Sequence, residues 1–149
     1  MHPLPHAMLV QPGDIRPMAI DDWQQFQKEG EQFLALAERA FAKKTKAFTT
    51  EILYNLTAMA MQKLVMAALM RIGRLPDNHT LGDLAAALTH WLPEAARGLT
   101  ESLGALDRFQ EICDMERATI LPPTLADIEA MLLLARRLER RLQPVPAMY

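Results

Sequence analysis

Hydrophobic positions recur every three or four residues along most of the chain, which is the spacing of an amphipathic α-helix. The pattern predicts a first helix that begins near Asp21 or Asp22, with an apolar stripe of Trp23, Phe26, Gly30, Phe33, Ala37 and Ala40. A second helix is predicted from about Thr50 to Ile72, with inward positions at Leu53, Leu56, Ala60, Leu64, Ala67 and Leu69 or Met70. Gly73 and Pro76 then supply the glycine and the trailing proline typical of a helix C-terminus.

Three further helices follow in the pattern. Thr80 is expected to cap a short helix that runs through Trp91, with Asp83 in the place of the usual glutamate. Pro93 suits the first turn of a fourth helix, whose stripe is Leu99, Leu103, Leu106, Phe109 and Ile112. Thr124 is expected to cap a last helix, with the stripe Leu125, Ile128, Leu132, Ala135, Leu138 and Leu142. The sequence therefore predicts an all-α fold, an up-down bundle of four long helices with an additional short helix.

The two ends of the chain differ from this helical region. Residues 1–20 contain four prolines and show no sustained period, so we expect a proline-rich N-terminal arm. Residues 144–149 contain Pro144 and Pro146 and are expected to form a short C-terminal tail. Between them, residues 21–143 are expected to form one helical domain.

Composition narrows the possible functions. With 149 residues and a formal net charge of −2, the chain has no general polyanion-binding signature, so DNA is not an expected partner. Its single cysteine excludes an intramolecular disulfide, and four histidines leave little material for a zinc site, so no metal and no cofactor are expected. No targeting segment is evident, and no apolar run approaches the roughly 20 residues of a membrane span. We therefore expect a cytoplasmic protein without a membrane partner.

The second helix and its exit resemble a known family. Residues 58–69 read AMAMQKLVMAAL, and they are followed by Gly73, Pro76 and the stretch NHTLGDL at 78–84. This order is similar to that of the HEPN domain, the nucleotide-binding helical bundle of higher eukaryotes and prokaryotes. Arg117 lies where that family often has an arginine-tyrosine-proline turn before its last helix. The resemblance covers about residues 22–142, although Gln62 stands where the family usually has an acid.

The resemblance implies a non-catalytic module that binds a nucleotide, a nucleotidyltransferase-type protein partner, or both, as a homodimer. It points to Lys63, His79 and Arg117 as nucleotide-binding residues. A lysine within an apolar stripe either contacts a ligand phosphate, extends to water at the edge of the stripe, or pairs with an acid such as Glu51 or Glu116. His79 either contacts the nucleotide or braces the turn before the short helix.

A toxin-like ribonuclease is the alternative from a different class of function. Many HEPN domains are metal-independent ribonucleases with an arginine followed by four to six residues and then a histidine. Arg74 and His79 match this spacing, but they lie between the second and third helices rather than near the last long helix. Arg117, at the family position, has no such histidine after it. Catalytic residues are therefore not assigned, and a purely structural oligomerisation domain remains a third interpretation.

Two surfaces suggest protein partners. The last helix carries a basic run, which is either a solvated face or a contact for an acidic partner or RNA phosphates, and consists of Arg136, Arg137, Arg140 and Arg141. Away from the main stripe of the second helix, an apolar dimer surface is expected from Met61 and Val65, together with Tyr54 and Met131.

Overall fold

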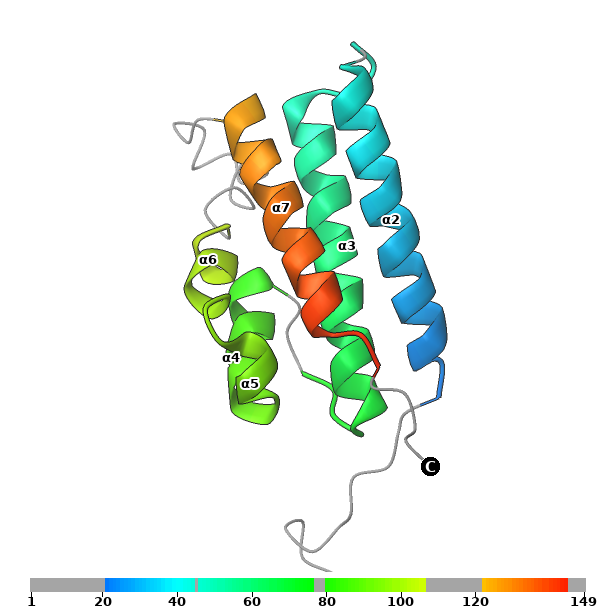
Figure 1. The fold of residues 1–149 in the computed structure, drawn as a ribbon, viewed down its shortest axis with the longest axis vertical. Coiled ribbons are helices and arrows are strands. Elements are labelled where there is room, and N and C mark those ends of the chain that lie inside the picture. Colours follow the sequence, from blue (N-terminus) through cyan, green and yellow to red (C-terminus); the bar gives the residue numbers. More distant parts are fainter. Residues whose placement is uncertain (1–20, 45, 77–79, 107–121, 145–149) are drawn as a thin grey trace, which may run out of the picture.

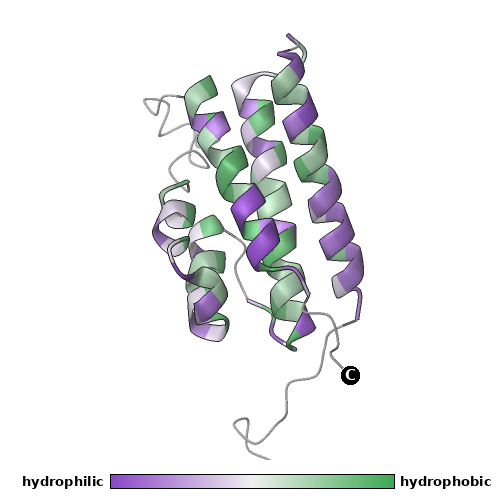
Figure 2. Cartoon of the chain, in the orientation of Figure 1, coloured by the Kyte–Doolittle hydropathy of each residue, from purple (hydrophilic) through white to green (hydrophobic). Residues whose placement is uncertain are grey.

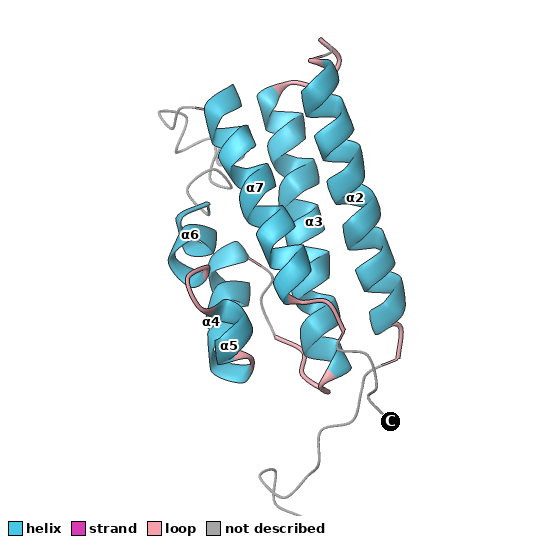
Figure 3. Cartoon of the chain, in the orientation of Figure 1, coloured by secondary structure: helices cyan, strands magenta, loops and turns pink. Residues whose placement is uncertain are grey.

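The described residues of the computed structural model, 21–44, 46–76, 80–106 and 122–144, are entirely helical apart from their connections (Figure 3). The helices are α2 (Trp23–Lys43), α3 (Thr50–Arg71), α4 (Leu81–Trp91), α5 (Pro93–Ala96), α6 (Thr100–Ala105) and α7 (Leu125–Arg141). The predicted all-α class is confirmed for this part of the chain. The predicted arm at residues 1–20 and most of the tail lie outside it.

Local capping chemistry sets several helix ends as the sequence predicts. The Thr80 hydroxyl accepts a hydrogen bond from the Asp83 amide at 3.1 Å, and α4 begins at the next residue. Thr124 and Asp127 form a reciprocal capping box at the start of α7. At the other end of α3, Gly73 adopts a φ of 77°, a left-handed conformation that glycine enters without the steric cost of a Cβ. The beginnings and ends of these helices are therefore encoded locally.

Helix α3 is the centre of the bundle, with α2 on one side and α7 on the other (Figure 1). The helix runs antiparallel to α2 and parallel to α7, and the crossover to α7 holds α4, α5 and α6. The α2–α3 contact is close at Gly30, where an added Cβ would lie 2.9 Å from Leu64 Cγ and 3.2 Å from the Ala60 carbonyl oxygen. Close approach of the two backbones is therefore the reason for a glycine inside α2.

Burial of α3 extends around most of its circumference, which overturns one expectation. Met61, Val65, Tyr54 and Met131 were expected to form an exposed dimer surface, yet all are buried in the core. The prediction was wrong because a helix packed between neighbours on several sides buries residues outside its main stripe as well. Leu125 departs in the opposite direction, since it belongs to the predicted stripe of α7 but is exposed.

The prediction of one long fourth helix from Pro93 is also wrong over the residues that the structure describes. The stretch divides into α5 and α6, because Gly98 takes a φ of 79° and Arg97 is extended with a ψ of 122°. Apolar spacing alone did not reveal this break, since Leu99 and Leu103 are buried as predicted. Phe109 and Ile112 lie outside the described residues. The up-down arrangement of four long helices is therefore not established by this fold.

One helix differs from the expectation that no apolar run is long enough to span a membrane. Judged by length and composition alone, α3 is apolar enough to cross a membrane. Its most apolar window is 67% buried by the rest of the described chain, as is usual for a core helix.

Candidate functional site

A hollow of about 440 Å³ lies where the C-terminal ends of α3 and α7 approach the corner between α4 and α5. The local sequence builds this corner, because Leu92 ends α4 and Pro93 begins α5 at once. The hollow is lined by Arg71, Trp91, Leu92, Pro93, Glu94, Ala95, Arg141, Leu142 and Gln143. It therefore combines cationic, aromatic and apolar side chains from three parts of the sequence.

Arg71 is a half-buried cation at the end of α3. Its Nη1 atom donates to the Leu142 carbonyl oxygen at 3.3 Å, and its guanidinium carbon lies 5.5 Å from the centroid of the Trp23 ring. Burial lowers the pKa of the Arg71 guanidinium from its ordinary value, although arginine still remains protonated near neutral pH. No carboxylate among the described residues forms an ion pair with it.

Arg141 supplies a second cation from the end of α7. Its Nη1 atom donates to the Arg97 carbonyl oxygen at 2.7 Å and to the Ala95 carbonyl oxygen at 3.4 Å. Both bonds use the same nitrogen, and no described residue accepts a hydrogen bond from the Nη2 or Nε atom of Arg141. The one acid in the lining, Glu94, pairs instead with Arg97 at 2.8 Å.

Trp91 provides the flat apolar wall of the hollow. Arg74 packs against the indole of Trp91, with its guanidinium carbon 3.7 Å from the ring centroid, as in a close cation–π contact. The His90 ring meets the Trp91 ring edge-on at 4.4 Å between centroids. Trp91 is nevertheless 40% exposed. Part of the indole surface is therefore available to a ligand.

These side chains determine which kinds of ligand the hollow can bind. Arginine donors bind phosphate and carboxylate groups strongly, and an indole ring stacks on flat aromatic groups. Among the described residues, no group of three His, Cys, Asp or Glu side chains is placed to hold a metal ion. The arrangement therefore favours binding of an anion that carries a flat ring.

Lys63, the first nucleotide-binding residue suggested by the sequence, lies elsewhere, on the α2–α3 face. Its Nζ atom is 2.7 Å from Glu29 Oε1 and 4.7 Å from the centroid of the Phe26 ring. Its side chain is 26% exposed. Of the acids suggested as partners, Glu51 is not the one that pairs with it, and Glu116 lies outside the described residues. Glu29 already supplies a counter-charge to this lysine.

The structure does not describe the other two suggested nucleotide-binding residues. His79 and Arg117 both lie outside the described ranges, so their positions stay predictions. Arg74, the first residue of the ribonuclease-like spacing, is described and rests against Trp91. Its Nε atom is buried without a hydrogen-bond partner among the described residues.

The basic run on α7 separates into different environments, although the end of the helix is strongly hydrophilic (Figure 2). Arg136 pairs with Glu38 on α2 and with Glu139, and the hydrogen bond with Glu38 raises the pKa of Arg136 above its ordinary value. Arg141 belongs to the hollow described above. Arg137 and Arg140 are exposed, and no carboxylate among the described residues pairs with either of them.

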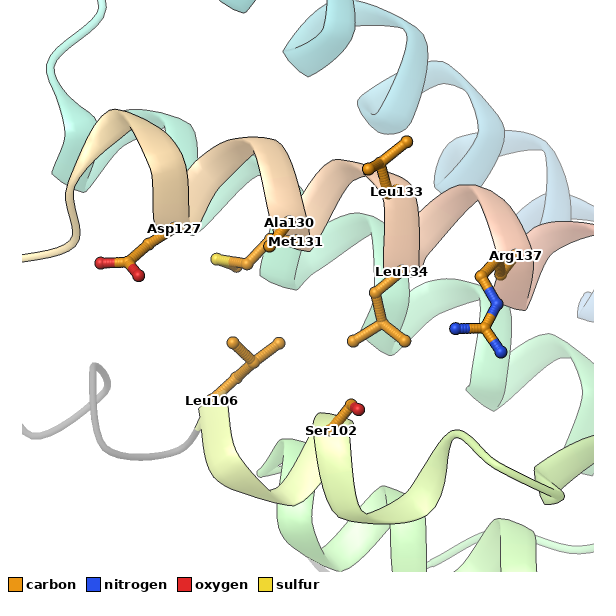
Figure 4. Close-up of a pocket in the computed structure, with 8 residues that line it drawn as sticks. All are labelled: Ser102, Leu106, Asp127, Ala130, Met131, Leu133, Leu134 and Arg137. Atoms are coloured by element: carbon orange, nitrogen blue, oxygen red, sulfur yellow. The ribbon is translucent and has the colours of Figure 1, made fainter.

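A smaller hollow of about 360 Å³ lies between α6 and α7 (Figure 4). Its floor is apolar, with Leu106, Met131 and Leu134, and Asp127 and Arg137 lie toward opposite ends. Leu106 is the last residue before a range that the structure does not describe. We therefore assign no function to this hollow.

The sequence reasoning missed two residues of the arginine–tryptophan hollow. The sequence pattern assigns no binding role to Arg71, which only bounds an apolar run, and it treats Trp91 only as an apolar position of the predicted short helix. A signal was present, since both lie at helix ends, where a bundle exposes side chains and backbone polar groups together. Nothing in their spacing, however, indicates that they face the same hollow as Arg141.

The Glu29–Lys63 pair makes a testable contribution to pH dependence. The hydrogen bond from Lys63 lowers the pKa of the Glu29 carboxyl, so its stabilising effect is present above the ordinary carboxyl pKa and is lost as pH falls through the lowered one. When the pH is lowered from about 7 to about 3, we expect the free energy of unfolding to fall less in Glu29→Gln than in the native chain. Urea unfolding at both pH values measures this, with the exposed Glu51→Gln as control. An identical acid-side loss in the native chain and in Glu29→Gln would contradict the expectation.

Comparison with family models, with curated proteins and with solved structures found no match to this chain.

Proposed function

We propose that the chain is a non-catalytic, HEPN-like helical-bundle module that binds a nucleotide in the hollow between the ends of α3, α4 and α7. The observation that carries the proposal is that Arg71 and Arg141 line the same hollow as the exposed part of Trp91. No carboxylate among the described residues neutralises either arginine. A nucleotide supplies the phosphate charge for the arginines and the flat ring for the indole.

The volume of the hollow supports a small ligand of this kind. At about 440 Å³ it falls within the range of roughly 300–1,000 Å³ for small-molecule sites. Leu92 and Leu142 add apolar surface beside the tryptophan. Such a mixture of apolar walls and a few directed polar groups is typical of ligand sites. Lys63, His79 and Arg117 remain the nucleotide-binding residues that the family resemblance implies.

The resemblance also implies a homodimer and a protein partner of the nucleotidyltransferase type. Arg137 and Arg140 are the members of the basic run best suited to an acidic partner, because they are exposed and unpaired within the described chain. Arg136 is less suited, since Glu38 and Glu139 already surround its guanidinium.

A thermal-shift screen with a panel of nucleotides tests the site. A ligand that binds the native state raises its melting temperature once its concentration exceeds the Kd. We expect Arg141→Gln and Trp91→Ala each to weaken binding about 10-fold or more, because each removes an interaction of roughly 1.4 kcal/mol or more. The matched control is Arg140→Gln, the neighbouring arginine outside the hollow, which should bind as the native chain does.

Three outcomes would contradict this site. One is that no nucleotide shifts the melting temperature at millimolar concentration. Another is equal weakening by Arg141→Gln and Arg140→Gln. The third is loss of the shift only in Lys63→Ala, which would move the ligand to the α2–α3 face. Metal-independent RNA cleavage abolished by His79→Ala would instead favour the ribonuclease alternative, and an effect on oligomeric state alone would favour the structural one.

A further inference from the structure

Helix α2 and its C-terminal flank carry opposite charges at their two ends. Residues 21–31 contain four acids and one base, whereas residues 38–46 contain four bases and one acid. The acidic end includes Asp21, Asp22 and Glu29, and the basic end includes Arg39 and Lys43. Two such helices laid antiparallel place unlike charges opposite each other at both ends, so the helix is complementary to a second copy of itself.

An apolar hollow of about 500 Å³ lies between these charged ends, at the middle of α2. Phe33 and Leu36 of α2 and Met59 of α3 provide its apolar lining, and Glu29, Gln32 and Lys63 provide its polar edge. Phe33 is the central residue of α2, which spans Trp23–Lys43. A two-fold axis through this region would bring the two hollows together and leave the charged ends flanking them.

This face points away from α7 and is open in the described structure. Glu38 marks the side of α2 that meets α7, since it pairs with Arg136. Leu36 is two residues earlier, so its side chain projects about 200° around the helix from that of Glu38. Met59 is 39% exposed here. Phe33 and Leu36 are partly buried, with Phe33 packed against the core, so the accessible surface of this face is the rest of these two side chains together with Met59.

We propose that a second copy of the chain docks on this α2–α3 face, with the two α2 helices antiparallel across a two-fold axis between Phe33 and Leu36. An axis near residue 34 places Glu29 opposite the partner's Arg39 and Gln25 opposite the partner's Lys43. Glu29 uses one oxygen for Lys63 and the other for Gln25, and each carboxylate oxygen can accept a second bond. The proposal deepens the homodimer part of the proposed function and does not depend on nucleotide binding.

The size of the face agrees with a dimer. A helix of 21 residues is about 30 Å long, and two adjacent helices are about 20 Å wide. The resulting footprint is on the order of 600 Å² per copy, the lower end of what specific interfaces bury on each partner. An interface of this size that relies on charge complementarity is expected to weaken as salt rises.

Sedimentation velocity without any nucleotide tests the proposal through paired charge reversals at exposed positions. Lys43→Glu with Lys46→Glu makes both ends of this segment acidic, and Asp21→Lys with Asp22→Lys makes both ends basic. Each double variant alone should lose at least about 10-fold in dimer affinity, which corresponds to about 1.4 kcal/mol. A one-to-one mixture should form heterodimers, because antiparallel pairing then restores unlike charges at both ends.

The matched control is Glu101→Lys with Glu129→Lys, exposed charge reversals on α6 and α7, which should dimerise as the native chain does. Circular dichroism confirms that each variant remains helical. For a variant that fails to fold, native dimer affinity at about 0.05 M and about 0.5 M salt gives an independent test, with at least a 10-fold loss expected. The proposal is overturned by a native chain that stays monomeric at about 100 μM, or by no salt effect. A variant mixture that fails to associate also overturns it. A monomeric native chain would instead favour docking of a helix from another protein on this face.

Discussion

Replacing Met61 by lysine is expected to lower the free energy of unfolding by about 4 kcal/mol or more at neutral pH. Met61 has 0% of its surface exposed, and it lies in the apolar core around α3. A lysine there must either bury its charge or lose its proton, and pKa shifts of up to three to five units for such groups correspond to about 4–7 kcal/mol. Domains of this size are commonly stable by only about 5–15 kcal/mol. The measurement is urea unfolding followed by circular dichroism.

Met59→Lys is the matched control for this substitution. It makes the same chemical change two residues earlier in α3, at a side chain that is 39% exposed and can extend its ammonium to water. At low micromolar concentration, where association contributes little, we expect its free energy of unfolding to stay within about 0.5 kcal/mol of the native value. Equal destabilisation by the two lysines would show that burial of Met61 is not what the α3 core requires.

Gly30→Val is expected to destabilise the bundle by about 3 kcal/mol. The contact with α3 leaves no room, because even a Cβ at this position would lie 2.9 Å from Leu64 Cγ. The Ala60 carbonyl oxygen, 3.2 Å away, belongs to the α3 backbone and cannot rotate aside. Removing a glycine from a helix interior gains about 1 kcal/mol at most, so crowding outweighs propensity. Thermal or urea unfolding gives the difference directly.

A second substitution tests whether crowding against Leu64 is the cause. Leu64→Ala alone should destabilise by about 2–5 kcal/mol, because Leu64 is fully buried and its removal leaves a cavity. When Leu64→Ala is combined with Gly30→Val, the valine fills part of that cavity. The double variant should therefore lose less free energy of unfolding than the two single losses added together, by about 1 kcal/mol or more. Simple additivity would argue against a steric contact between the two positions.

The sequence predicts the fold well where the determinants are local. Thr80 and Thr124 cap helices because a hydroxyl reaches an amide three residues ahead, and Gly73 ends α3 because it can take a positive φ. The break at Gly98 escaped prediction because the apolar spacing continues through it. All-round burial of α3 also escaped, since one stripe of a helix does not reveal how many neighbours surround it.

The candidate site was less predictable because its parts are distant in sequence. Arg71, Trp91 and Arg141 come from three helices, and only packing brings them to one hollow. Lys63 was recognised as a charge within an apolar helix, but its partner Glu29 lies 34 residues earlier on another helix. Local patterns identify such unusual residues, whereas their partners depend on how the helices are arranged.

The contacts of Arg71 affect how this bundle can be inserted into a longer chain. The guanidinium lies over the ring of Trp23, the first residue of α2, and donates to the carbonyl of Leu142, immediately after α7. The chain therefore enters and leaves the three long helices at nearly the same place. Domains with adjacent ends tolerate circular permutation and insertion into a surface loop of another protein. Joining these ends by a short linker, with new ends opened between α2 and α3, preserves the order in which the three helices pack.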